Sequence, residues 1–211
     1  MLPLEAVELT TQVAAVVVQE FAESVGQKLD ARAAAGAPVL SPAKAVAKDL
    51  VDSFLVLHPD GKVTVYVGKV DLGTGTKTAM AQIAAEELDV PFAAITMVMG
   101  DTATTPDQWL TGANLTIAQG GGELRRACAT ARGALVTRAA QRLGAPASAL
   151  TVSDGVVRVK GDATKSITYA QLMQGGGFDL KVDPKAPLKP ASEYKVVGTS
   201  VARVDIPEKV T

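Results

Sequence analysis

Residues 68–101 of the chain read GKVDLGTGTKTAMAQIAAEELDVPFAAITMVMGD, and residues 111–122 read TGANLTIAQGGG. In the first stretch a strand enters the glycine turn Gly73-Thr74-Gly75, and a helix and a second strand follow. The second stretch is a polar, glycine-rich turn that opens another helix. Glycine permits a positive φ and a close approach to the backbone, and a helix start offers unpaired N–H groups to an anion. The pattern of both turns together predicts an anion site where they converge, although the first turn taken alone favours an ordinary strand-to-helix connection.

Hydrophobic periodicity around these stretches predicts the remaining elements. The expected elements are strands at 53–58 and 62–67, a helix at 76–88, a strand at 95–99, a long helix at 117–143, a hairpin at 150–159, and a short strand with a helical turn at 166–173. Pro59-Asp60-Gly61 and Asp154-Gly155 are the turn signals of the hairpins. The expected fold class is α/β (α+β), with a mixed sheet layered against the two main helices at 76–88 and 117–143.

The sequence divides into three regions. Residues 1–40 are expected to form an N-terminal helical extension, because apolar positions recur there at mostly helical spacing. Residues 41–178 are expected to form the α/β domain. Residues 179–211 are rich in proline, lysine and alanine at first and end without a closing element, so we expect a linker that leads to a following domain.

Composition narrows the class of protein. The 211 residues are 47% hydrophobic and 20% charged, which is enough to bury a core. A net charge of −1 gives no reason to expect nucleic acid or an acidic membrane as partner. One cysteine and one histidine exclude an internal disulfide and a cysteine-cluster metal site. No stretch reaches the roughly 20 apolar residues of a membrane span, and no export signal is visible, so the compartment stays open.

The second turn carries the polar groups best suited to a ligand. It consists of Thr111, Gly112, Ala113, Asn114, Leu115 and Thr116. Its small residues expose the backbone, and its hydroxyl and amide groups can bond a polar heterocycle or a pyrophosphate. The alternative is a cluster of N-cap residues for the helix beyond. The run Gly120-Gly121-Gly122 favours a ligand or a backbone that comes close, because each glycine costs a helix about 1 kcal/mol relative to alanine.

Other candidate side chains favour structural interpretations. Four arginines at 125, 126, 132 and 138 lie on the long helix and are expected to form a solvated face. Glu86 and Glu87 lie within the first helix and are expected to be structural. Cys128 is expected to be a small core residue. Trp109 can be a core or interface anchor or a shield over a ligand, and the sequence does not decide between them.

These segments together resemble a known family. GKVDLGTGTKTAMAQIAAEELDVPF, then GDT and TPDQ, then TGANLT with the following QGG, resemble the molybdopterin-binding large subunit of the xanthine dehydrogenase and aldehyde oxidase family. The branch that they resemble most is that of isoquinoline 1-oxidoreductase and nicotinate dehydrogenase. The resemblance covers roughly residues 45–211, in the order of the family's motifs and with plausible gaps.

The resemblance implies a cofactor site. Leu72, Gly73 and Thr74, with Gly75 in the same turn, match the loop that touches the pterin-dithiolene end of the molybdenum cofactor. Residues 111–116 match the segment that binds the pterin and its phosphates, and Gly120 and Gly121 would lie near the dinucleotide part. In bacteria this cofactor is typically the cytosine dinucleotide form of molybdopterin.

The resemblance also implies a reaction and partners. The family hydroxylates aromatic N-heterocycles or aldehydes with oxygen from water, and a glutamate near the far C-terminal end of the large subunit is the general base. No matching motif occurs in this chain, so no catalytic residue is assigned and the isolated chain is expected to be inactive. The expected partners are the remainder of the large subunit, an iron–sulfur small subunit and a small-molecule substrate, because one cysteine cannot hold a cluster. The alternative is a non-catalytic α/β interaction module that kept the fold without the cofactor.

Overall fold

The computed structural model describes residues 46–174 and 176–206. The chain separates into two compact units, Met1–Ala43 and Lys44–Thr211, and the described residues all belong to the second. The helical extension expected at residues 1–40 lies outside the described residues. Within the described ranges no helix is both long and apolar enough to cross a membrane.

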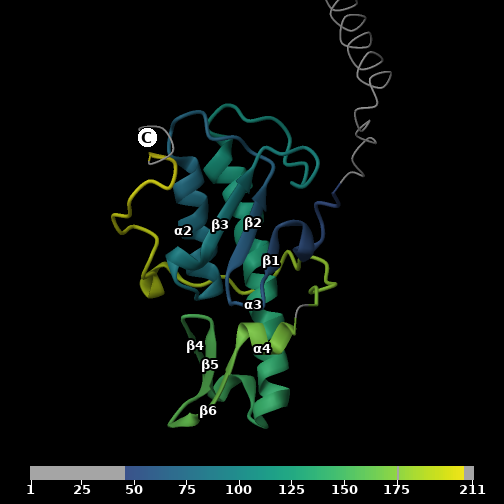
Figure 1. Cartoon of the computed structure of the whole chain (residues 1–211), viewed down its shortest axis with the longest axis vertical. Helices are drawn as coiled ribbons and strands as arrows, with labels where there is room; N and C mark the ends of the chain where they lie inside the picture. The colour runs from purple at the N-terminus through teal and green to yellow at the C-terminus, as the bar shows by residue number, and fades with distance from the viewer. Residues whose placement is uncertain (1–45, 175, 207–211) are drawn as a thin grey trace, which may run out of the picture. The chain divides into compact units, whose positions relative to one another are not determined.

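A three-stranded mixed sheet forms the centre of this unit (Figure 1). Strands β1 (Leu55–Leu57) and β2 (Val63–Val67) form the expected antiparallel hairpin, and β3 (Ile95–Met99) pairs with β2 in parallel from Val63–Ile95 to Val67–Met99. The crossover between β2 and β3 is helix α2 (Thr76–Leu88). The inward residues of β2 are fully buried valines, as their alternation predicts.

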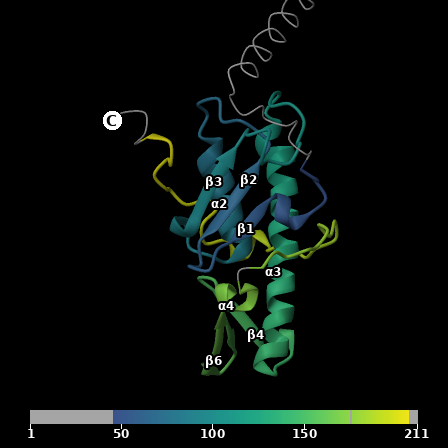
Figure 2. The same cartoon turned by 45° about the vertical axis from the view of Figure 1, so that its right-hand side comes forward.

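Helix α3 (Gly122–Leu143) packs on α2 and is long enough to pass the mixed sheet and reach a second one (Figure 2). Both helices carry small residues that are fully buried in the core, including Ala84 on α2 and Ala127 and Ala131 on α3. Cys128 is buried there too, and burial raises the pKa of its thiol, as fits a core residue. The predicted helix at 117–143 begins with a π-helical segment, η3 (Thr116–Gly121).

The second sheet is antiparallel and consists of β4 (Leu150–Ser153), β5 (Val156–Val159) and β6 (Asp162–Thr168). The short helix α4 (Tyr169–Met173) follows, and Thr168 and Gln171 form its capping box. The Tyr169 hydroxyl donates to the Leu88 carbonyl oxygen at 3.0 Å, which links the start of α4 to the end of α2. The α/β (α+β) class and the mixed sheet with two main helices are confirmed, and the C-terminal hairpin belongs to a separate sheet.

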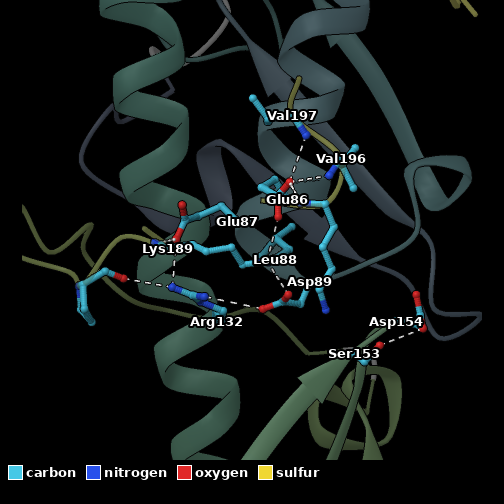
Figure 3. Close-up of polar contacts among 12 residues, drawn as sticks. Glu86, Glu87, Leu88, Asp89, Arg132, Ser153, Asp154, Lys189, Val196 and Val197 are labelled. Atoms are coloured by element: carbon cyan, nitrogen blue, oxygen red, sulfur yellow. Dashed lines mark hydrogen bonds and ion pairs between the residues drawn. The ribbon is translucent and has the colours of Figure 1, made fainter. Parts of the chain in front are cut away.

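Residues 187–199, here called the strap, are held by the buried carboxylates of Glu86 and Glu87 on α2 (Figure 3). Glu87 Oε1 accepts the backbone N–H of Lys189 at 2.9 Å. Glu86 Oε2 accepts the backbone N–H groups of residues 195–197 at 2.8, 2.6 and 2.9 Å. Glu86 Oε1 accepts Lys189 Nζ at 2.9 Å. Burial alone would raise the pKa of Glu86. The backbone hydrogen bonds and the ammonium of Lys189 have the larger, opposite effect and lower this pKa to about 2. Glu86 therefore stays ionised inside the protein and fixes the path of the strap.

The arginines of α3 do not form a solvated face, which corrects the interpretation from sequence. Arg125 Nε and Arg132 Nη2 each donate to the buried carboxylate of Glu87 at 2.9 Å. Arg138 is half-buried near α4, and Arg126 is the member of the group that is exposed. Their spacing on the helix cannot reveal such partners, because Glu87 lies 38 and 45 residues before Arg125 and Arg132. The expectation that Glu86 and Glu87 are structural is confirmed.

Candidate functional site

The candidate site lies at one end of the parallel strands β2 and β3. Their carboxyl ends, Val67 and Met99, lie at the same edge of the sheet, and the loops 68–75 and 100–115 leave from that edge (Figure 1). In sheets of this kind ligands bind outside the carboxyl ends of the strands. The position therefore brings two loops to a place where a ligand is expected.

Hydrogen bonds join the two loops directly. The Gly68 N–H donates to Gln108 Oε1 at 3.0 Å, and the Val70 N–H donates to Thr111 Oγ1 at 2.9 Å. A side chain at Gly68 has no room, because a Cβ there would lie 2.0 Å from the Pro106 carbonyl oxygen. The loops that carry the two predicted turns thus lie side by side.

Two polar residues that sequence reasoning missed build this junction. Lys69 is fully buried, and its Nζ donates to the Leu110 carbonyl oxygen at 2.8 Å. Gln108 is buried and donates from Nε2 to Glu123 Oε2 at 2.7 Å and to the Gly120 carbonyl oxygen at 3.2 Å. Nothing in their spacing marks them, since a lysine and a glutamine in loops are usually exposed.

The first turn does not offer the free amides that its sequence suggested. Asp71 Oδ1 accepts the N–H groups of Gly73 and Gly75 at 2.9 and 3.2 Å, and Oδ2 accepts that of Lys77 at 2.9 Å. Burial raises the pKa of the Asp71 carboxyl, but the backbone hydrogen bonds of the turn outweigh burial and hold it below its usual range. Leu72 is 73% exposed and Thr74 is also exposed, so the turn presents side chains outward.

The C-terminal part of the described chain lies against the same turn. Arg203 Nη1 donates to the Gly73 carbonyl oxygen at 3.3 Å, while Arg203 Nε and Nη2 form a two-pronged pair with Asp205. The Val204 N–H donates to Thr78 Oγ1 at 3.0 Å. Among the described residues, Thr76 Oγ1 at the start of α2 is a buried side-chain oxygen that has no hydrogen-bond partner.

The second turn adopts a backbone that non-glycine residues rarely take. Ala113 and Asn114 have φ values of 48° and 58° and are exposed. Such left-handed residues cost about 1 kcal/mol or more and cluster at functional sites. Thr111, Gly112 and Leu115 are half-buried beside them, and Thr116 is buried at the start of η3. A π-helical segment at this point is also typical of functional sites.

Side-chain packing explains the glycines of η3. A Cβ at Gly120 would lie 3.0 Å from Lys69 Cγ and 3.3 Å from Met80 Cε, and one at Gly121 would lie 3.1 Å from Ile83 Cδ1. Both glycines are buried.

Large apolar side chains on the two loops and at the start of η3 are exposed. They are Val70, Leu72, Trp109, Leu110 and Ile117, which are 41–73% exposed and are here called the apolar rim. Trp109 is 65% exposed and has a left-handed backbone at φ 64°, so it is not a core residue. In the part of the chain that the structure describes, no group of three or more histidine, cysteine or acidic side chains can hold a metal ion.

Comparison with known proteins gives one family. The sequence profile described as the molybdopterin cofactor-binding domain matches residues 15–208. A subunit of nicotinate dehydrogenase from Pseudomonas putida is 44% identical over 158 residues, which are 75% of this chain and 13% of that protein. The beta subunit of isoquinoline 1-oxidoreductase from Brevundimonas diminuta is 28% identical over 193 residues, covering 73% of this chain and 25% of that protein. The chain thus spans a quarter or less of these relatives.

Comparison with solved structures also finds oxidoreductases. Quinoline 2-oxidoreductase from Pseudomonas putida 86 matches with a TM-score of 0.50 and 30% identity over 56% of this chain and 15% of that chain. Carbon monoxide dehydrogenase from Oligotropha carboxidovorans matches with a TM-score of 0.52 and 26% identity over 61% of this chain and 16% of that chain. The described unit is therefore similar to a limited part of each of these larger proteins.

Proposed function

Because this chain belongs to the molybdopterin cofactor-binding domain family, we propose that it contributes part of the molybdopterin site in a molybdenum hydroxylase large subunit. The supporting observation is the junction of the loops 68–75 and 100–115 at the carboxyl ends of β2 and β3. A ligand that contacts both loops needs this junction, and the fold supplies it through buried Gln108 and Lys69.

The described residues fit a molybdopterin cofactor through exposed polar side chains and through one hydroxyl that lacks a hydrogen-bond partner. The residues that would hold it are Leu72, Gly73, Thr74 and Gly75 in the first turn and residues 111–116 in the second. Thr74 and Asn114 are exposed polar side chains, and Thr76 Oγ1 is buried without a partner next to the first turn. The amides of Gly73 and Gly75 do not contribute, because Asp71 engages them. When bound, the molybdenum cofactor supplies a two-electron oxidation that hydroxylates an N-heterocycle or an aldehyde.

The finer chemistry of the proposal follows from the resemblance of the sequence motifs. We assign the cytosine dinucleotide form of molybdopterin to this site and the iron–sulfur clusters to a partner subunit. Both relatives are named as single subunits of larger enzymes, which supports a multi-subunit complex here. Cys128, the only cysteine of the chain, is buried in the core and cannot hold a cluster.

The apolar rim supports the proposal that the remainder of the large subunit covers this face. Large exposed apolar side chains that gather on one part of a protein can mark an interaction site, and four of the five rim residues lie in the loops that would hold the cofactor. The relatives are four or more times as long as their matching part, so most of such a subunit lies outside the matched region.

A second candidate is a non-catalytic interaction module that kept the fold. The carboxylate of Asp71 favours it, since this group occupies backbone amides that a cofactor would otherwise use. Metal and nucleotide analysis separates the two candidates. The chain is purified with its partners from its native host, molybdenum is measured by mass spectrometry, and cytidine monophosphate is measured after acid hydrolysis.

The proposed function predicts molybdenum and cytidine monophosphate in nearly equal amounts, and the module predicts neither. Replacing both Thr74 and Asn114 by alanine should lower both contents together. Ser192→Ala, an exposed change in the strap, is the matched control and should leave them unchanged. The isolated chain should not turn over an N-heterocycle, and turnover without any partner would contradict the assignment of the general base to another part of the large subunit.

A further inference from the structure

We propose that Asp71 is a positioning residue that closes the first turn to anions, so that this turn meets an uncharged part of its ligand. The inference rests on the proposed function only where it treats the turn as a ligand-binding loop. The closure itself is a property of the chain without any ligand.

The geometry makes Asp71 an internal anion. One carboxylate accepts three backbone N–H groups, those of Gly73, Gly75 and Lys77, at 2.9, 3.2 and 2.9 Å. Gly75 is the N-cap of α2, has a left-handed backbone at φ 80°, and provides no side-chain cap. The cap is therefore supplied from four residues before the helix boundary, by a group that carries the charge a bound phosphate would carry.

The same geometry excludes a second anion. Three amides of the turn and helix start, those of Gly73, Gly75 and Lys77, are already engaged by Asp71. A phosphate beside the carboxylate would also meet a like charge. The nearby cation does not reverse this, because the guanidinium of Arg203 forms a two-pronged pair with Asp205. What remains on the outer side of the turn is the exposed Leu72 and Thr74 side chains.

The two turns are therefore expected to bind different parts of the ligand. The first turn offers apolar and hydroxyl contacts, which suit a neutral ring system. Any phosphate of the ligand is left to the second turn at 111–116 or to groups outside this chain. Asp71 thus determines the polarity of the ligand part that the first turn accepts.

The test removes the carboxylate and supplies it again from solution. In the full-length chain without cofactor, Asp71→Ala should lower the melting temperature by about 2–8 °C, as expected for a lost helix cap in a unit of this size. Hydrogen exchange at the amides of Gly73, Gly75 and Lys77 should accelerate roughly tenfold. Sodium formate, compared with sodium chloride at the same concentration, should reverse part of both effects, while the wild-type chain should not respond.

Asp107→Ala is the matched control. Asp107 also accepts a backbone N–H two residues ahead, that of Trp109 at 2.8 Å, but does not stand at a helix start. Formate should not rescue Asp107→Ala. The inference is overturned if formate leaves Asp71→Ala unchanged, or if it stabilises both variants equally.

A milder variant covers the case in which Asp71→Ala does not fold. Asp71→Asn keeps one acceptor oxygen for Gly73 and Gly75 and places an N–H group opposite the Lys77 amide. Exchange should then accelerate at Lys77 and stay slow at Gly73, and unchanged exchange at Lys77 would refute the role of Asp71. These measurements need no molybdenum, so their failure leaves the cofactor proposal intact, and a cofactor-free native complex would leave the closure of the turn intact.

Discussion

Replacing Glu86 by glutamine is expected to destabilise the protein in a way that depends on pH. The carboxylate is 3% exposed, accepts three backbone N–H groups from the strap and pairs with the ammonium of Lys189 (Figure 3). A glutamine keeps an oxygen for the strap but presents an N–H group to Lys189 and lacks the charge. The loss of a buried, charged acceptor of this kind costs about 3 kcal/mol.

The pKa of Glu86 gives the part of this free energy that varies with pH. The pKa falls from 4.5 to about 2 on folding, and a depressed pKa stabilises the folded state above the unfolded value and loses that effect as pH falls through the folded value. The contribution is then about 3 kcal/mol at pH 7 and about 1 kcal/mol at pH 3. The gap in unfolding free energy between wild type and Glu86→Gln should therefore narrow as the solution is acidified.

The assay is urea unfolding of both proteins, followed by circular dichroism, at intervals from pH 7 to pH 3. At pH 7 the variant should also melt about 6–12 °C lower. Glu193→Gln is the control, because Glu193 is an exposed carboxylate in the same strap, and its effect should stay within about 0.5 kcal/mol. A gap that is below 1 kcal/mol at pH 7, or that does not change between pH 7 and pH 3, would show that the strap does not depend on the ionised carboxylate.

Further substitutions test the packing and the exposed loops. Gly120→Ala should cost about 1–3 kcal/mol in urea unfolding, because its Cβ would crowd Lys69 and Met80, while Gly133→Ala, with nothing within 4 Å, should be neutral or stabilising. Gly68→Ala should separate the two loops and cost more than Gly120→Ala, since the Cβ would meet backbone 2.0 Å away; equal costs by the same assay would argue against the junction. Trp109→Ser should leave the melting temperature of the isolated chain within about 2 °C but reduce recovery of the rest of the large subunit in a pull-down from the native host. Unchanged recovery would argue against the apolar rim as an interface.

Local signals predicted most of the fold. Helix α2 begins at Thr76 and ends at Leu88, as the glycine turn and the following Pro91 indicate. Strands β2 and β3 lie where their β-branched runs indicate, but the expectation that 95–99 is a buried strand was wrong, because only Met97 of β3 is buried. These features depend on neighbouring residues, and a single sequence carries that information. The convergence of the two loops also follows from sequence, because parallel neighbouring strands end at one edge.

Contacts between distant residues could not be predicted in the same way. Glu87 accepts hydrogen bonds from Arg125 and Arg132 on the other helix. Lys189 donates to Glu86, although the two lie more than 100 residues apart along the chain. A charged residue on a helix has the same local sequence whether it faces water or a buried partner. The solvated face proposed for the arginines was wrong for this reason.

The first turn shows how far a motif determines chemistry. Two glycines before a helix do predict a turn whose amides point to one place, and Gly73 and Gly75 have the positive φ that this requires, 92° and 80°. Whether those amides bind a ligand depends on what else can reach them, and here the competitor is encoded two residues before the first glycine. A carboxylate on the chain is always present at the site, whereas an anion from solution must lose freedom of motion to bind there. An aspartate just upstream of a glycine turn therefore predicts a self-capped helix start, and the search for phosphate-binding groups in such a sequence belongs on the other loop.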